Sequence, residues 1–260
     1  SDRKRIVVKV GTSTLTHRTG MLNIRRVEQL VKTLADIQNS GHEVILVSSG
    51  AIGLGMGKLG LRERPKDTPG KQACAAVGQC ELMYLYDNLF AEYSITVAQM
   101  LLTKYILLED RRKNVENAME RLIAHGVIPI INENDTVAID ELELEVGEND
   151  SLAATVAAIA KADLLIIMSD IDGLYDKDPH TYDDARLIPV VHEITDDIRA
   201  LAGGAGTKLG TGGMITKLNA VEIAYDSDID VVLMNGQHPK TLYDLFDGKT
   251  VGTFFCKKPD

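Results

Sequence analysis

Short apolar runs separated by helical patterns are the feature that most constrains the fold of this chain. Each run is rich in valine and isoleucine, and most lack the polar–apolar alternation of a half-exposed strand. Parallel strands that are covered on both faces have this composition. The runs are IVVKV (6–10), EVILVSS (43–49), ITVAQM (95–100), VIPII (127–131), LLIIMS (164–169) and DVVLM (230–234).

Amphipathic helices are predicted between these strands. In the first, Asn23 is a candidate N-cap, apolar residues recur at helical spacing from Ile24 to Ile37, and Gly41 follows the end. Similar patterns occupy 70–90, 111–125, 150–161 and 214–225. Repeated strand–helix–strand units predict an α/β three-layer sandwich, with a mainly parallel sheet between helices.

No linker or internal repeat divides the chain, so we expect a single domain over residues 1–260 whose C-terminal part forms a second lobe over the same sheet. Residues 137–147 alternate apolar and acidic side chains, which predicts an exposed hairpin or edge strand. Residues 170–213 are expected to be rich in loops.

The composition narrows the classes of partner and compartment. A net charge of −10 without an evident basic face argues against nucleic acid and against an anionic membrane surface. No apolar stretch reaches the length of a membrane span, and no signal peptide is evident. Three cysteines form neither a disulfide framework nor a zinc pattern, so we expect a reducing, cytoplasmic location.

Polar or glycine-bearing residues follow four of the predicted strands. Ligands of open parallel sheets bind beyond the carboxyl ends of the strands, so these positions predict a site for an anionic ligand. They are Gly11-Thr12-Ser13, Ser49-Gly50-Ala51, Asn132-Glu133-Asn134-Asp135 and Ser169-Asp170.

Lys9 lies inside an apolar strand, two residues before Gly11. It is either an edge-strand lysine whose ammonium group reaches water or a functional residue, and the glycine–hydroxyl loop that follows favours function. At residues 148–150, Glu-Asn-Asp opens an apolar helix. These residues could simply cap it, or an acidic side chain there could hold lysines or magnesium.

Several familiar motifs are matched only in part. The stretch GTKLGTGGMITK (206–217) has the glycines, hydroxyls and lysines of a phosphate site but not the spacing of a P-loop. Gly55, Gly57 and Gly60 match a dinucleotide fingerprint in the wrong context, so a flexible glycine loop is the simpler interpretation. A third interpretation is that Gly50, Gly53 and their neighbours let a ligand approach backbone N–H groups. The acidic run from Asp170 lacks the final glutamate of a calcium loop.

Taken together, seven blocks resemble the glutamate 5-kinase family of the amino-acid kinase superfamily, in order and over essentially the whole chain. They are VVKVGTSTL, VSSGAIGLG, NENDTV, VGENDSLAA, SDIDGLYDKDP, GTGGMITK and GTFF. The resemblance implies ATP-dependent phosphorylation of the side-chain carboxylate of L-glutamate, the first step of proline biosynthesis. It also implies Mg²⁺, proline as a feedback inhibitor, and a homo-oligomer, either a dimer or a tetramer.

The resemblance also implies the site residues. The catalytic group would be Lys9 and Lys217, both oriented by Asp150. Glutamate would be bound in the N-terminal part by Ser49, Gly50, Asp135 and Asn149. ATP would be bound by Lys9 and Gly11 together with residues of the C-terminal part, about 165–260: Ser169, Asp170, Thr211, Gly212, Gly213, Met214, Ile215, Thr216 and Lys217.

Two departures from the family pattern stand out. Glu148 occupies a position where the family usually has aspartate, and the chain stops at Asp260, whereas many members continue into a PUA domain. The alternatives are another kinase of the superfamily, a non-catalytic amino-acid sensor, and the kinase half of a pyrroline-carboxylate synthase. The pair Gly11-Thr12 favours glutamate kinase over superfamily members with Gly-Gly there, and the retention of Lys9, Asp150 and Lys217 disfavours the sensor.

Overall fold

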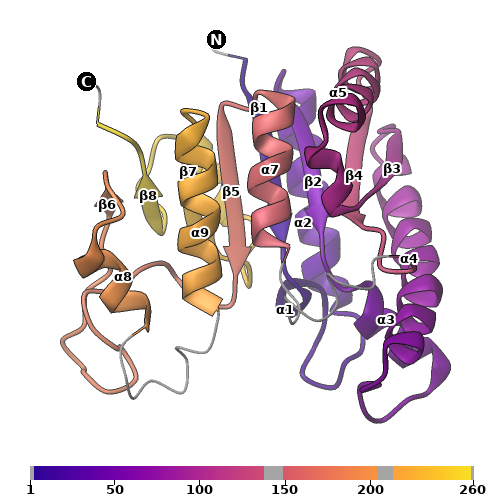
Figure 1. Cartoon of the computed structure of the whole chain (residues 1–260), viewed down its shortest axis with the longest axis horizontal. Helices are drawn as coiled ribbons and strands as arrows, with labels where there is room; N and C mark the ends of the chain where they lie inside the picture. Colours follow the sequence, from indigo (N-terminus) through magenta and orange to yellow (C-terminus); the bar gives the residue numbers. More distant parts are fainter. Residues whose placement is uncertain (1–2, 138–148, 204–212, 259–260) are drawn as a thin grey trace.

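A computed structural model describes residues 3–137, 149–203 and 213–258 of the chain. Within these residues the strands form one eight-stranded sheet in the order β3-β4-β2-β1-β5-β7-β8-β6 (Figure 1). All neighbouring strands are parallel except β7 and β8, which are antiparallel. The strands are β1 (Arg5–Val10), β2 (Glu43–Ser48), β3 (Val97–Leu102), β4 (Ile128–Glu133), β5 (Leu164–Ser169), β6 (Val190–Val191), β7 (Asp230–Asn235) and β8 (Thr253–Phe255).

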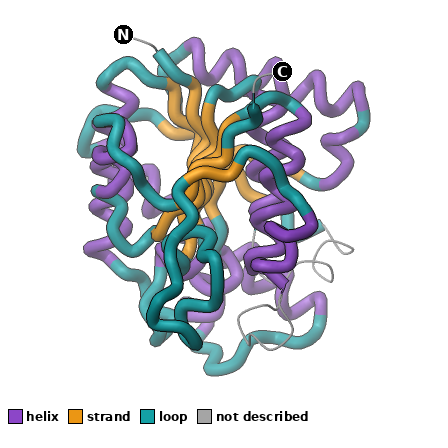
Figure 2. Tube along the Cα trace, turned by 90° about the vertical axis from the view of Figure 1, so that its left-hand side faces the viewer, coloured by secondary structure: helices purple, strands orange, loops and turns teal. Residues whose placement is uncertain are grey.

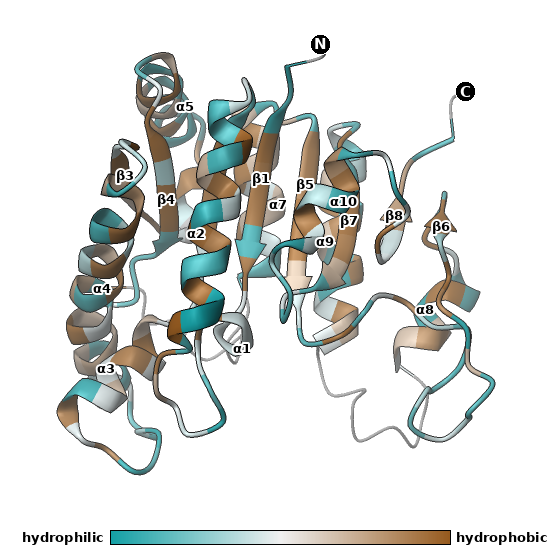
Figure 3. Cartoon of the chain, turned by 180° about the vertical axis from the view of Figure 1, so that it is seen from behind, coloured by the Kyte–Doolittle hydropathy of each residue, from teal (hydrophilic) through white to brown (hydrophobic). Residues whose placement is uncertain are grey.

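Helices cover both faces of this sheet, which runs through the middle of the molecule (Figure 2). Apolar residues of α5, α7, α8 and α9 form the core on one face, and those of α2, α3, α4 and α10 form the core on the other (Figure 3). The helices are α1 (Thr12–Leu15), α2 (Ile24–Asn39), α3 (Ala51–Leu59), α4 (Thr68–Ala91), the 3₁₀ helix η1 (Lys104–Leu107), α5 (Glu109–Ala124), α7 (Asp150–Ala160), α8 (Asp196–Gly203), α9 (Gly213–Asp226) and α10 (Thr241–Phe246). The predicted three-layer α/β sandwich is therefore confirmed.

The central strand β1 lies at the switch point of the topology. Its neighbours are β2 on one side and β5 on the other, so the chain leaves β1 in one direction and later returns to its opposite edge. The loops beyond the carboxyl end of β1 diverge at such a point and leave room for a ligand. The interpretation of Lys9 as an edge-strand lysine is therefore wrong.

The alternation of side chains along β1 decides which helices Lys9 meets. Ile6, Val8 and Val10 belong to the core on the α2 and α4 face, whereas Val7 belongs to the core on the α7 and α9 face. Because successive side chains of a strand point to opposite faces, Lys9 lies on the same face as Val7. Its ammonium group is directed toward the layer formed by α7 and α9.

The predicted strands and long helices are confirmed, with small shifts at their ends. The side-chain oxygen of Asn23 accepts a hydrogen bond from the Arg26 backbone N–H and caps α2, as expected. The third strand begins two residues later than predicted, because the Ile95 backbone N–H donates to Phe90 O and closes the turn that follows α4. Of the predicted hairpin 137–147, all but the first residue lies outside the described residues.

One loop prediction is confirmed and one is wrong. Apart from the short helix α8, the two-residue edge strand β6 and an isolated bridge, residues 170–203 form loops and turns, as expected. The glycines of AIGLGMGKL, interpreted as a flexible loop, lie within α3 or at its end. Glycine lowers helix propensity by about 1 kcal/mol, so the sequence argues against a helix here unless packing compensates.

Packing between α3 and α4 explains these glycines. A Cβ atom on Gly55 would lie 1.8 Å from Cys74 O, and one on Gly78 would lie 1.5 Å from Ala51 O. The two helices can approach this closely only because residues 55 and 78 have no Cβ atom to meet the facing carbonyl group. The glycines therefore allow α4 to pack closely on α3. Local sequence patterns do not indicate such a contact between two helices.

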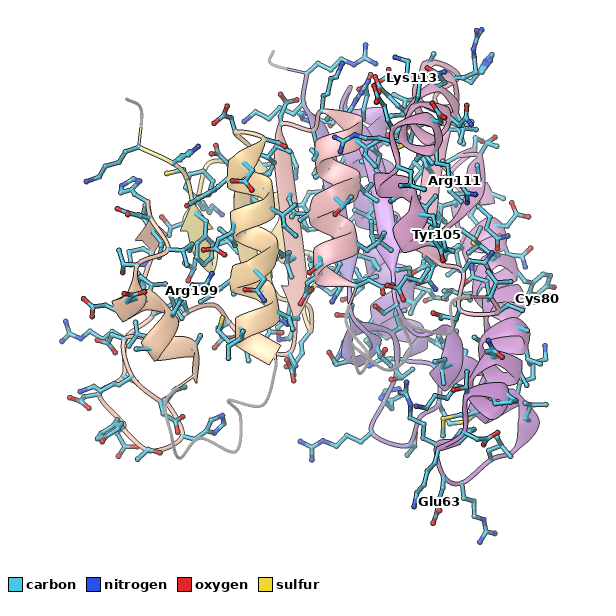
Figure 4. All side chains as sticks on the ribbon, in the orientation of Figure 1. Glu63, Cys80, Tyr105, Arg111, Lys113 and Arg199 are labelled. Carbon is cyan, nitrogen blue, oxygen red and sulfur yellow. The ribbon has the colours of Figure 1, made fainter. Side chains whose placement is uncertain are left out.

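The outer surface of the molecule carries an exposed cysteine and a contact between an arginine and an aromatic ring. Cys80 is exposed on the outer side of α4, and the guanidinium group of Arg111 lies 5.5 Å from the centroid of the Tyr105 ring (Figure 4). In the described part of the chain, none of the helices has both the length and the apolar character needed to cross a membrane.

Candidate active site

A buried carboxylate stands between two buried lysines at the carboxyl edge of the sheet. Asp150 is the first residue of α7, and its side chain is fully buried. Its Oδ1 lies 2.9 Å from Nζ of Lys9, and its Oδ2 lies 3.3 Å from Nζ of Lys217. Charged side chains are rarely buried unless they are paired, and in this trio the carboxylate is paired with both ammonium groups.

The first turn of α9 supplies the other contacts of the trio. Lys217 Nζ donates to Gly213 O at 3.2 Å, and Thr216 Oγ1 lies 3.1 Å from Asp150 Oδ2. Gly213 and Lys217 are four residues apart, so both lie on one side of the helix. Two ammonium groups and one carboxylate leave the trio with an excess of positive charge, which suits an anionic ligand.

The turn after β2 is shaped by a left-handed glycine. Gly50 has a φ of 103° and precedes α3, and a φ in this range favours glycine over every other residue. Ser49 is almost fully buried, and its backbone N–H donates to Val10 O at 3.0 Å. Its Oγ has no hydrogen-bond partner among the described residues, which leaves this hydroxyl available to a ligand.

Tyr86, which the sequence analysis did not single out, contacts this turn through Ser48. Ser48 Oγ donates to Ser49 O at 3.1 Å and lies 2.8 Å from the hydroxyl of Tyr86, in α4. Burial raises the pKa of Tyr86, so the phenol stays protonated. The Ser48 proton is used by Ser49 O, so the Tyr86 hydroxyl is the donor of this pair.

The side chain of Asn149 makes a different contact from the predicted one. Asn149 is the N-cap residue of α7, but its side chain forms no capping hydrogen bond. Instead, its Nδ2 donates to Oδ1 of Asn132 at 2.6 Å, at the end of β4. The interpretation that the Asn149 side chain caps α7 is therefore wrong. Asp135, three residues beyond Asn132, is half-buried in the turn that follows β4.

The ends of β5 and β7 complete this edge of the sheet. Ser169 is buried, and its hydroxyl oxygen accepts from the Ile171 backbone N–H, whereas Asp170 is exposed. Gly236, just after β7, was not among the predicted site residues. A Cβ atom on it would lie 2.2 Å from Thr14 Oγ1, so a glycine is needed at this close approach. The Asn-Gly dipeptide was the available turn signal.

The predicted ATP residues are not all brought into contact. Lys9, Lys217, Thr216 and Gly213 converge on Asp150 or on one another. Gly11 is nearby, since a Cβ atom on it would lie 3.5 Å from Lys9 Nζ. Met214 is half-buried against the core, and the side chain of Ile215 is exposed. Thr211, Gly212 and also Glu148 lie outside the described residues.

Sequence comparison relates the chain to known kinases. Residues 4–235 match the amino acid kinase family. The chain is 52% identical over 260 residues to "Glutamate 5-kinase" of Clostridium perfringens, an alignment that covers 99% of this chain and 97% of the relative. It is 54% identical over 255 residues to the protein of the same name from Clostridium tetani, with 98% and 95% covered.

Structural comparison gives the same fold at much lower identity. The carbamate kinase from Giardia lamblia bound to AMP-PNP superposes with a TM-score of 0.69 and 17% identity, covering 98% of this chain and 99% of that one. The UMP kinase of Ureaplasma parvum gives a TM-score of 0.66 at 16% identity over 99% of this chain and 100% of that one. At these identities the likeness concerns the fold alone.

Proposed function

The chain belongs to the amino acid kinase family and within it to the glutamate 5-kinases, and on this premise we propose that it phosphorylates the side chain of L-glutamate. One carboxylate oxygen of glutamate attacks the γ-phosphorus of ATP, and the bond from that phosphorus to the β–γ bridging oxygen breaks. The products are L-glutamyl 5-phosphate and ADP. The reaction is the first step of proline biosynthesis.

The observation that carries this proposal is the trio of Lys9, Asp150 and Lys217, with contacts of 2.9 and 3.3 Å. Phosphoryl transfer depends on positioning and on neutralising the charge of the transferred group. Ammonium groups fixed by a buried carboxylate are preorganised for that charge and need not reorganise during the reaction. Lys9 and Lys217 act on the phosphate oxygens, and Asp150 orients both lysines.

The acceptor needs no general base. The side-chain carboxyl group of free glutamate has a pKa of about 4.3 and is already ionised at neutral pH. The site must therefore hold two anions in line, the glutamate carboxylate and the γ-phosphate of ATP. Lysines that come from different elements can neutralise this charge from two sides. Lys9 comes from β1 and Lys217 from α9, so the transferred group would lie between the two halves of the sheet.

Each half of the molecule is proposed to bind one substrate. The N-terminal part binds glutamate through Ser49, Gly50, Asp135 and Asn149, with the carboxylate of Asp135 suited to the substrate ammonium group. The C-terminal part, about 165–260, binds ATP. Its contacts are assigned to Ser169, Asp170 and the segment Thr211–Lys217, together with Lys9 and Gly11 from β1 and the loop that follows it.

Magnesium is expected to enter with the nucleotide. Within residues 3–137, 149–203 and 213–258, no three His, Cys, Asp or Glu side chains gather into a group that could hold a metal ion. Asp150 is in contact with both lysines, so these side chains do not by themselves make a magnesium site. The phosphate oxygens of ATP are the hard ligands that Mg²⁺ prefers, and we assign the ion to them.

The proposal also covers how the enzyme is regulated, how its subunits assemble and where in the cell it is located. Membership of the family supports feedback inhibition by proline, a homo-oligomer and a cytoplasmic location. A proline titration of the initial rate tests the first, and light scattering on the purified protein tests the second. A rate that stays constant at saturating proline would remove the feedback role.

The decisive test measures ADP release with Mg-ATP against glutamate, N-acetylglutamate, aspartate and UMP. Hydroxylamine is included because it converts an acyl phosphate into a stable hydroxamate. We expect ADP release and hydroxamate formation with glutamate alone. Activity with another acceptor would overturn the substrate, and ATP binding without turnover on any acceptor would favour the sensor hypothesis.

Asp135→Ala tests the acceptor half separately. Loss of a charged partner for the substrate ammonium group is expected to raise the KM for glutamate by about tenfold or more. The KM for ATP should change less than about twofold, because uniform binding of only one substrate is lost. Equal increases in both KM values would argue against a substrate-side role for Asp135.

A further inference from the structure

A chain of amide side chains connects α4 to the N-terminus of α7. Gln79 Nε2 donates to Gln99 Oε1 at 3.1 Å, and Asn132 Nδ2 donates to Gln79 Oε1 at 3.0 Å. Asn149 Nδ2 then donates to Asn132 Oδ1 at 2.6 Å. The chain thus joins β3, α4, β4 and the N-cap residue of α7.

One backbone group determines the direction of every hydrogen bond in this chain. The N–H of Glu133 donates to Asn132 Oδ1 at 2.9 Å, and a backbone N–H can only donate. Asn132 must therefore turn its Nδ2 to Gln79, and Gln79 must turn its Nε2 to Gln99. Asn149 likewise presents its Nδ2 to Asn132, so its carbonyl oxygen faces the other way.

The same strand alternation that directs Lys9 directs Asn132 to the opposite layer. Ile128 and Ile130 belong to the core on the α4 face, so Asn132, two residues further along β4, points to α4 as well. The close approach of Gly78 to Ala51 O seats α4 on α3 one residue before Gln79. The backbone packing of α4 on α3 therefore fixes the position of Gln79 relative to β4.

We propose that Gln79 is a positioning residue for the acceptor substrate, acting through Asn132 on the amide of Asn149. This inference rests on the proposed function, since Asn149 is assigned there to glutamate binding. Gln79 holds Asn132 in one orientation, and Asn132 in turn fixes which atom of Asn149 faces the substrate. Without Gln79, Asn132 keeps only its contacts with Glu133 and Asn149, and the amide of Asn149 is less strictly oriented.

Gln79→Met tests this role, because methionine has a similar length and no hydrogen-bonding amide. The loss of one hydrogen bond predicts a rise of about 3- to 10-fold in the KM for glutamate. The KM for ATP should stay within about twofold of the wild-type value. Gln79→Glu keeps an acceptor for Asn132 Nδ2 and should restore the KM for glutamate to within about threefold of wild type.

A double-mutant cycle distinguishes positioning from a general structural effect. In an Asn149→Ala background, Gln79→Met should change the KM for glutamate less than about twofold, because the residue it acts through is gone. Gln29→Met is the matched control, since Gln29 is also a half-buried helical glutamine and has no side-chain hydrogen bond in the described part of the chain. It should leave both KM values unchanged.

The outcomes separate this inference from the proposed function. A wild-type enzyme that forms no glutamyl hydroxamate contradicts the proposed function and, with it, the role of Gln79. A wild-type enzyme that turns glutamate over, with Gln79→Met at the wild-type KM or with equal effects in both backgrounds, overturns the role of Gln79 alone. If Gln79→Met does not fold, Gln99→Met removes the far end of the chain and should raise the KM for glutamate alone, by a smaller factor.

Discussion

Asp150→Asn is expected to destabilise the fold as well as to abolish turnover. The substitution keeps the shape of the side chain and removes its negative charge. Lys9 and Lys217 are buried, at 0% and 1% exposure, and both contact this carboxylate. The variant therefore leaves two buried ammonium groups without the anion between them, which is the costly way to break a buried ion pair.

The contact distances give the size of the effect. With an effective dielectric constant of 20, Coulomb attraction at 2.9 and 3.3 Å amounts to about 6 and 5 kcal/mol, before the opposing cost of desolvation. Measured losses on removing one partner of a buried pair are about 3–5 kcal/mol. We expect the free energy of unfolding to fall by that amount. Lys217→Met should cost less, because Lys9 keeps its partner.

Urea unfolding at pH 7, followed by circular dichroism without nucleotide, measures this difference. Asp110→Asn is the matched control, because Asp110 is an exposed aspartate in the first turn of α5. It should lose at most about 1 kcal/mol, the contribution of a carboxylate near a helix N-terminus. Asp150→Asn within about 1 kcal/mol of wild type would refute the argument that the carboxylate holds the two lysines in the fold.

Three further predictions concern catalysis, packing and pH. Lys217→Ala should lower kcat at least about 100-fold with the circular dichroism spectrum unchanged, and near-wild-type kcat would remove Lys217 from the mechanism. Gly78→Ala should lower the free energy of unfolding by about 2 kcal/mol or more, because the new Cβ would lie 1.5 Å from Ala51 O; an unchanged urea midpoint would contradict the close packing of α3 and α4. The hydrogen bond from Arg5 holds the pKa of Glu120 below its usual value, so this stabilisation is present above about pH 4.3 and is lost as the pH falls through the folded-state pKa. The free energies of unfolding of wild type and Glu120→Gln in urea should therefore differ by under about 1 kcal/mol at pH 7, because Glu120 is half-exposed, and should converge near pH 3. A difference that widens on acidification would refute this sign.

The strands and the long helices were predictable because their signals are local. A continuous Val- and Ile-rich run such as LLIIMS records burial on both faces, and β5 coincides with it. Asn23 before an apolar period of 3.6 marks the start of α2, and the structure places the helix there. The helix α3 was missed, because its glycines are explained by contacts with α4 and local propensity argues against them.

The sequence by itself determined the inventory of the proposed site. It placed a lysine within a strand, a glycine–hydroxyl loop beyond it, an aspartate at a helix start and a second lysine in a glycine-rich segment. These are local facts of composition and spacing, so one sequence suffices to recognise them. Their roles in binding and catalysis remain predictions that the proposed experiments test.

Only the tertiary structure decided which of these residues meet. Lys9, Asp150 and Lys217 are separated by more than 60 residues at each step, and the strand order brings β1, α7 and α9 together. The amide chain through Gln79 depends on the depth at which α4 packs, which backbone contacts of Gly55 and Gly78 set. Such contacts depend on the relative placement of whole elements, a quantity that no local pattern of residues encodes.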